Sequence, residues 1–242
     1  VYHLQSDVEG APTVYVQSAV HAAEMQGSAV IYELIKALKS TNLVANFILV
    51  PNCNPFGRTQ RAGEYLQGRF DATNGNNWNR FYYYNESSVA TFVEDNLTSL
   101  KTMSDAGITS LFRGFLAVEL EQQLNSKWGV NTAQYLNIKL QQLANNADLV
   151  LDLHTGPSST RHLYSPDFLV DEAYDFNIEN IISIPVAFAG ALDEASFTPW
   201  QELARELKKH DIDFDYRVKA FTVELGSQEN ICLAQANEDA KG

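Results

Sequence analysis

The sequence of 242 residues is poor in cysteine and in basic residues. Its two cysteines, Cys53 and Cys232, are too few for a disulfide framework, and no C-x-x-C pair is present to hold a structural metal. Two buried thiols are the simplest interpretation, although one bridge between them stays open. With 17 Lys and Arg against 30 Asp and Glu, the formal net charge is -13. Such a surface repels phosphate backbones, so we expect no nucleic-acid partner.

Long hydrophobic runs are also missing. No stretch approaches the roughly 20 apolar residues that a membrane-spanning helix needs, and no signal peptide opens the sequence as given. We therefore expect a cytoplasmic protein with no membrane partner. Hydrophobic residues make up 45% and charged residues 19% of the chain, which is typical of a globular protein. This length predicts one domain over residues 1–242.

Apolar patterns indicate an α/β fold. Residues 13–20 are predicted to form a buried strand, residues 28–38 show helical spacing of apolar side chains, and residues 47–50 form a second strand. A strand–helix–strand unit is typical of a sheet with crossover helices. A further strand is predicted at the start of the chain, Val1–Leu4, and three more at 148–153, 181–189 and 221–226. Residues 88–146 are expected to be mainly helical, and a helix is predicted to begin at a proline, over Pro199–Lys209.

Ionisable side chains follow three of these strands. His21 and Glu24 come after the first, His154 ends another, and Glu224 interrupts the last. Open α/β sheets bind ligands beyond the carboxyl ends of their strands, so these side chains should converge. The spacing of His21 and Glu24 places both on one face of a helical turn. With His154 they would form the His₂Glu set of a catalytic zinc site.

Each of these residues has a simpler interpretation when it is taken alone. His21 could cap a helix or fill the core, His154 could be satisfied in a loop, and Glu224 could face solvent from a half-buried strand. Their shared position after buried strands favours the metal site. In that site, Glu224 would be the general base that takes a proton from water and gives it to the leaving amine.

The segment from residue 52 to residue 80 is irregular and holds several arginines. Long irregular segments inside a compact domain are often functional, and arginine matches carboxylates and oxyanions. Arg58 and Arg61 are interpreted as solvated loop charges. Trp78 and the tyrosines at 82–84 are expected to pack beneath this segment rather than to bind a sugar or a base.

Taken together, the motifs resemble the zinc carboxypeptidase fold, and more specifically its succinylglutamate desuccinylase/aspartoacylase branch. The resemblance rests on five pieces in the family's order: His21-x-x-Glu24, Pro51-Asn52-Cys53-Asn54-Pro55-Phe56-Gly57, Asn79-Arg80, Asp152-Leu153-His154-Thr155 and Glu224-Leu225-Gly226. It implies a three-layer α/β/α fold with a mixed, mostly parallel sheet. It also implies one Zn²⁺ held by His21, Glu24 and His154, with Glu224 as base and acid.

The resemblance also assigns the substrate contacts. Asn79 and Arg80 would hold a free carboxylate, and Arg69 would polarise the scissile carbonyl, with Arg61 as the fallback. Asn76-Asn77-Trp78 stand where several relatives carry an Asp. Relatives usually continue into a small C-terminal β domain. This sequence ends about one helix-length after the proposed base, so that domain is either absent or lies outside the sequence.

Two further residues, Arg161 and Tyr164, follow His154 and would reach a second carboxylate or the acyl group, unless they are ordinary surface residues. The predicted reaction is hydrolysis of the amide bond of a small N-acyl amino acid. The alternative is a zinc metallocarboxypeptidase that removes the C-terminal residue of a short peptide. A binding protein on a decayed hydrolase fold is disfavoured, because every expected ligand and the base are present.

Overall fold

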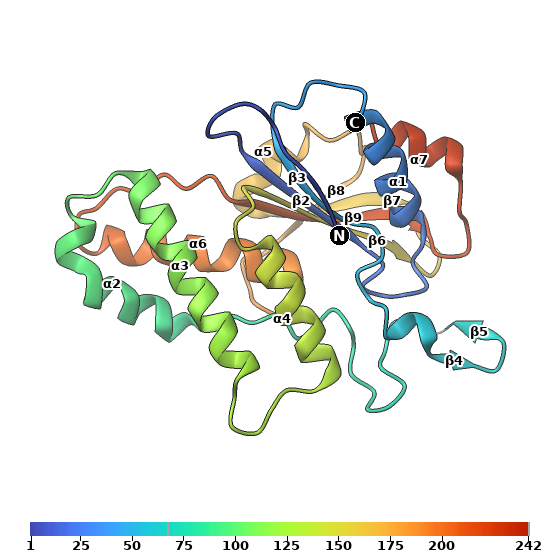
Figure 1. The fold of residues 1–242 in the computed structure, drawn as a ribbon, viewed down its shortest axis with the longest axis horizontal. Coiled ribbons are helices and arrows are strands. Elements are labelled where there is room, and N and C mark those ends of the chain that lie inside the picture. The colour runs from blue at the N-terminus through green and yellow to red at the C-terminus, as the bar shows by residue number, and fades with distance from the viewer. Residues whose placement is uncertain (67, 242) are drawn as a thin grey trace.

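The computed structural model describes residues 1–66 and 68–241. Its central strands are, in chain order, β1 (Tyr2–Leu4), β2 (Thr13–Ser18), β3 (Asn46–Val50), β6 (Leu149–Gly156), β7 (Arg161–Pro166), β8 (Ile181–Ile184) and β9 (Lys219–Ser227). They form a seven-stranded sheet in the order β1-β3-β2-β6-β9-β7-β8 (Figure 1). A separate two-stranded hairpin consists of β4 (Arg61–Ala62) and β5 (Tyr65–Leu66).

Most neighbouring strands of the sheet are parallel. β3, β2, β6 and β9 run parallel to one another, whereas β1 and β7 are antiparallel to their neighbours β3 and β9. β8 then follows β7 in parallel. The predicted mixed, mostly parallel sheet is therefore confirmed. β7 was not predicted, because its mixture of polar and apolar residues lacks the apolar run that marks the central strands.

Helices cover both faces of the sheet. They are α1 (Gln26–Leu38), α2 (Glu86–Leu100), α3 (Asp105–Leu124), α4 (Thr132–Ala144), α5 (Val170–Ala173), α6 (Leu192–Lys208) and α7 (Leu233–Asp239), with short 3₁₀ turns at Gly57–Thr59 and Asp167–Leu169. α1 and α7 pack on one face, and α4 and α6 on the other (Figure 1). The three-layer α/β/α prediction is confirmed, and α2 and α3 form an extension that packs against α6.

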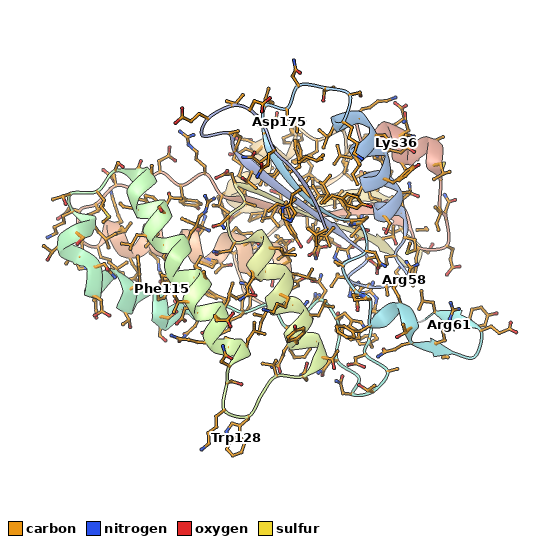
Figure 2. All side chains as sticks on the ribbon, viewed as in Figure 1. Lys36, Arg58, Arg61, Phe115, Trp128 and Asp175 are labelled. Atoms are coloured by element: carbon orange, nitrogen blue, oxygen red, sulfur yellow. The ribbon has the colours of Figure 1, made fainter. Side chains whose placement is uncertain are left out.

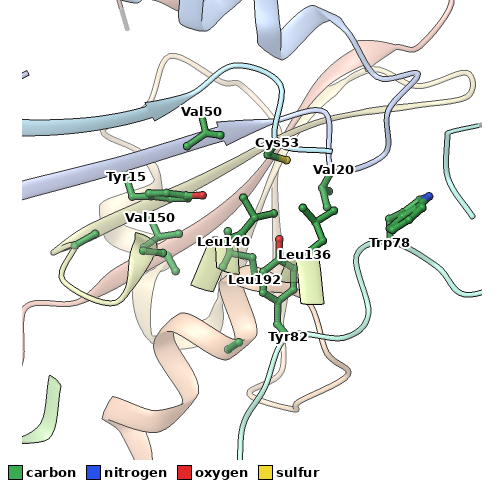
Figure 3. Close-up of a cluster of buried hydrophobic side chains, with 14 of the residues drawn as sticks. Tyr15, Val20, Val50, Cys53, Trp78, Tyr82, Leu136, Leu140, Val150 and Leu192 are labelled. Atoms are coloured by element: carbon green, nitrogen blue, oxygen red, sulfur yellow. The ribbon is translucent and has the colours of Figure 1, made fainter. Parts of the chain in front are cut away.

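The core beneath α4 and α6 joins the sheet to the irregular segment. Tyr15 and Val150 of the sheet pack with Leu140 of α4, and Trp78 and Tyr82 belong to the same cluster (Figure 3). The exposed fractions of Trp78 and Tyr82 are 0% and 3%, so the packing predicted for them is confirmed. The two cysteines are free thiols. In the described part of the chain, no helix is both long enough and apolar enough to cross a membrane.

The predicted start of α6 was wrong. The helix begins at Leu192, so Pro199 lies inside it rather than at its first position. The reason is a local cap: the Glu194 carboxylate accepts hydrogen bonds from the backbone N–H groups of Ala189 (2.7 Å) and Ala191 (3.1 Å). A proline inside a helix cannot donate a backbone hydrogen bond, which costs stability. The cap stabilises a first turn that begins before Pro199, and this stabilisation outweighs that cost.

Candidate metal centre and substrate pocket

A sharp turn after β2 delivers two of the predicted ligands. Ala19 has a φ of 63°, a left-handed conformation that is strained for a residue with a Cβ and is often found at functional sites. The backbone N–H of Glu24 then donates to the carbonyl of His21 at 3.0 Å, closing one turn before α1 begins. The predicted spacing is thus realised in an isolated turn, where His21 and Glu24 are buried.

The side chains of His21, Glu24 and His154 meet at the carboxyl edge of the sheet. The Nδ1 atom of His21 lies 3.0 Å from Oε1 of Glu24, and the Nδ1 atom of His154 lies 2.8 Å from Oε2 of the same carboxylate. One potential ligand atom from each residue lies within 4.8 Å of the others. Two imidazole nitrogens and a carboxylate are donors that zinc prefers, so this His₂Glu cluster fits a zinc ion.

The outer nitrogens of both histidines are also held. Nε2 of His21 lies 2.9 Å from Oδ1 of Asn77, and Nε2 of His154 lies 2.9 Å from Oδ2 of Asp152 and 3.2 Å from the side-chain amide of Asn79. Histidines that bind metals are usually oriented by such a partner on the second nitrogen. Asp152 stands two residues before His154 on β6, so both side chains point to the same face of the sheet.

Charge and burial shift the pKa values within the cluster. Burial favours the neutral form of Glu24, but its hydrogen bonds with the two histidines outweigh this and hold its pKa well below the usual range. Burial also opposes a charge on His154, yet the carboxylates of Asp152 and Glu24 raise its pKa well above the usual value. At His21 burial dominates and lowers the pKa. A metal ion would displace the proton of His154, which couples binding to pH.

Of the two arginines considered for carbonyl polarisation, the structure brings Arg69 to the cluster. Its guanidinium donates to Oε1 of Glu24 at 2.9 Å. Gly68 allows this approach: its φ is +65°, and a Cβ there would lie 2.4 Å from the backbone nitrogen of Ala23. Arg61 instead lies on the β4–β5 hairpin at the edge of the molecule (Figure 2), exposed and bonded to the carbonyl of Glu64.

A pocket of ~450 Å³ opens beside the cluster. Among its lining residues are Arg69, Asn79, Arg80 and Tyr164, all of which the sequence had placed at the site. Asn79 is buried, whereas Arg80 is exposed and donates to the carbonyl of Asn79 at 2.6 Å. The pocket therefore has cationic groups on the side of the irregular segment.

Glu224 lines the same pocket from β9. It pairs in register with His154 on β6 and with His162 on β7. Burial, with the negative charge of Glu24, raises its pKa above the usual carboxyl value. In the described residues, its buried Oε2 has no hydrogen-bond partner. A carboxyl group with a raised pKa and an available oxygen suits proton transfer.

Arg161 is the one predicted site residue that the structure places elsewhere. Successive residues of β7 point to opposite faces, so His162 and Tyr164 face the pocket while Arg161 forms an ion pair with Asp239 of α7. The expectation that Arg161 lines the pocket is corrected by this alternation.

Sequence reasoning also missed several polar residues at or beside the pocket, among them Asn77, Asp152, His162, Asp193 and Thr222. The alternation along the central strands was a usable signal for Asp152 and Thr222. No local signal marks Asp193, because only the true start of α6 places it in the pocket wall.

Fold and site together define an α/β protein with a His₂Glu cluster and arginines at the carboxyl edge of a mixed sheet. The chain belongs to the succinylglutamate desuccinylase/aspartoacylase family, because the model of that family's catalytic domain matches residues 10–242. The resemblance drawn from the short motifs is confirmed.

Solved structures agree with this assignment. The chain is 42% identical (TM-score 0.93) to a protein from Shewanella amazonensis SB2B and 39% identical (TM-score 0.93) to one from Shewanella frigidimarina NCIMB 400, both described as belonging to this family. It aligns over 99% of its own length but spans only 64% and 63% of these relatives.

A more distant structure shares the fold alone: the ectoine utilization protein EutE (DoeB) from Ruegeria pomeroyi, at 15% identity and a TM-score of 0.56, with coverage of 96% of this chain and 54% of that one. None of the curated proteins matches the chain.

Proposed function

We propose that this chain is a zinc-dependent hydrolase that cleaves the amide bond of an N-acyl amino acid. The observation that carries this proposal is the buried His₂Glu cluster, which lies in one pocket with Glu224 and the arginines Arg69 and Arg80. Membership of a family named for a desuccinylase and an acylase supports the same reaction.

Each side chain has a role that its position supports. A zinc ion, when bound to the cluster, supplies a Lewis acid that polarises a carbonyl and lowers the pKa of water. Glu224 removes a proton from the attacking water and delivers it to the nitrogen of the leaving amine. Its raised pKa brings it closer to neutral pH, where such transfer is efficient. Arg69 stabilises the negative charge that develops on the carbonyl oxygen.

The remaining pocket residues hold the substrate. Arg80, with the buried amide of Asn79 beside it, binds the free carboxylate of the amino acid. Tyr164 faces the pocket from β7 and contacts the acyl group or a second carboxylate. Arg161 has no part in this proposal, because its guanidinium pairs with Asp239.

A carboxylate anchor beside a zinc site would also serve a metallocarboxypeptidase, which binds the C-terminal carboxylate of a peptide. An activity screen of the zinc-loaded protein separates the two candidates. It should compare N-acetyl and N-succinyl amino acids with short peptides. Hydrolysis of the acyl amino acids that is lost on chelation and in Glu224→Gln supports the proposal. Cleavage of peptides alone would replace it with the carboxypeptidase, and turnover that survives chelation would contradict both.

A further inference from the structure

A buried carboxylate that is not part of the His₂Glu cluster lies in the wall of the pocket. Asp193 is 3% exposed and stands at the start of α6. It accepts a hydrogen bond at 2.8 Å from the backbone N–H of Glu194, and the side chain of Thr222 lies near enough to lower its pKa. Thr222 precedes Glu224 by two residues on β9, and both line the pocket. Two residues of strand separate these positions by about 7 Å, so the part of the wall beside Thr222 is distinct from the part that carries Glu224.

The Asp193 carboxylate has no basic partner among the described residues. Among residues 1–66 and 68–241, none of the ion pairs involves it. Arg69 pairs with Glu24, and Arg80 donates to a backbone carbonyl. Burial, together with the nearby carboxylates of Glu194 and Asp152, raises the pKa of Asp193 to about 6. A ligand that brings a positive charge would therefore relieve a burial cost that the hydrogen bond from Glu194 offsets only in part.

The neighbouring carboxylate does a different job. Glu194 also lines the pocket, but its Oε2 atom accepts hydrogen bonds from the backbone N–H groups of Ala189 and Ala191 and so caps α6. Of the two acidic residues that open this helix, only Asp193 combines near-complete burial with a place in the pocket wall and no capping role.

The loop before α6 fixes Asp193 relative to the carboxylate anchor. Gly190 has a φ of +96°, and a Cβ there would lie 2.5 Å from the carbonyl oxygen of Arg80. Its own carbonyl accepts a hydrogen bond from the backbone N–H of Tyr82 at 3.2 Å. The loop that leads into α6 is therefore packed directly against the segment that carries Arg80, and Asp193 and Arg80 line the same pocket.

We propose that Asp193, supported by Thr222, binds a positively charged group on the side chain of the substrate, so that the enzyme prefers N-acyl derivatives of basic amino acids. This inference rests on the proposed function and names its substrate class. Arg80 would hold the α-carboxylate, the amide would lie between the cluster and Glu224, and the cationic end of the side chain would reach Asp193.

Binding of the product amino acid tests the inference without any turnover. Isothermal titration of the zinc-loaded protein should compare L-lysine, L-ornithine and L-2,4-diaminobutyrate with the neutral L-norleucine. At least one cationic amino acid should bind tenfold or more tightly than norleucine, and Asp193→Asn should remove the preference. Glu194→Gln is the matched control and should keep it. Equal binding of all four amino acids would overturn the inference. An Asp193→Asn variant that binds all four equally more weakly would also overturn it, and would mean that Asp193 only orients Arg80.

Kinetics then separate this inference from the reaction itself. On the Nα-acetyl derivative of the preferred amino acid, Asp193→Asn should lower kcat/KM about 10–100-fold, because a charge-assisted contact is lost. On Nα-acetyl-norleucine its effect should be below threefold. A binding preference without hydrolysis of any acyl amino acid would refute the proposed function and leave the cation site standing. Hydrolysis of both acyl amino acids, with the same loss of kcat/KM on each in Asp193→Asn, would support the proposed function and refute the cation site. Thermal unfolding of each variant confirms that it is folded.

Discussion

The two faces of the central sheet differ sharply, although the same strands build both. On β6 and β9, alternate residues pack in an apolar cluster beneath α1 and α7: Leu151, Leu153, Val223 and Leu225. The residues between them are polar and face the pocket or the side chains that support it: Asp152, His154, Thr222 and Glu224. One face is therefore built for stability, and the carboxyl end of the other is built for chemistry.

The polar face is held together by a chain of buried hydrogen bonds. The amide of Gln17 donates to Asp152 at 2.9 Å and to the hydroxyl of Tyr82 at 3.0 Å, and it accepts from Tyr15 at 2.9 Å. Asp152 in turn contacts His154. Burying such groups is costly unless every partner is present. Placing a rigid support there makes sense if the histidine must be held in one orientation for a metal.

The largest expected effect is the difference in zinc binding between variants of two adjacent residues of β6, His154 and Leu153. His154→Ala should abolish stoichiometric zinc binding, because it removes one of the three proposed ligands. Leu153→Ala, whose side chain is 5% exposed on the apolar face, should keep the zinc and lose about 2–5 kcal/mol of stability. Metal analysis and urea unfolding of both variants check this. One zinc per chain in His154→Ala would remove that residue from the ligand set.

Adjacent residues of β9 give the second comparison. Glu224→Gln should retain zinc and lower kcat about 10²–10⁴-fold, since it cannot take up the proton from water. Val223→Ala, on the apolar face at 4% exposure, should lose roughly 2 kcal/mol of stability with turnover per folded molecule unchanged. Steady-state kinetics at matched zinc occupancy provide the measurement. Full turnover by Glu224→Gln would show that another group carries the proton.

These contrasts also explain what the sequence could predict. The central strands are rich in apolar and β-branched residues, with only a few polar positions between them, so β2, β3, β6 and β9 were recognisable. His21, His154 and Glu224 were recognisable because they interrupt or follow such runs. β7 has no such run, so its alternation could not be used, and Arg161 was grouped with Tyr164 as a substrate contact.

The remaining misses depend on contacts between distant segments. Asn77 reaches His21 through the folding of an irregular loop. Asp193 lies in the pocket wall because the cap at Glu194 lets α6 begin at Leu192, seven residues before the predicted start at Pro199. Neither position carries a local pattern, because neither is set by the periodicity of its own element.

The polar face should also lower stability in a pH-dependent way. The pKa of Asp193 is raised to about 6 from an ordinary 3.8 by burial, so the folded state holds its proton more tightly than the unfolded state. Stability then falls as pH rises through this window, by at most about 3 kcal/mol. Asp193→Asn removes the charge and should be the more stable protein at pH 7.5, with the difference vanishing below pH 4. Urea unfolding from pH 4 to 7.5 tests the sign, and a variant that is less stable at pH 7.5 would contradict it.

The smallest expected effect tests whether Asp152, which contacts His154 but is not a proposed metal ligand, contributes to zinc affinity. Asp152→Asn keeps the size of the side chain but not its charge, so Nε2 of His154 or the amide of Gln17 loses its best acceptor. Zinc affinity should fall about 10–100-fold, as for other groups that orient a metal-bound histidine. Leu151→Ala changes the adjacent residue on the apolar face and should leave the affinity within threefold. Competition with a chelator measures both. If the two variants weaken zinc equally, the effect comes from general loss of stability, and the division of labour between the two faces does not extend beyond the pocket.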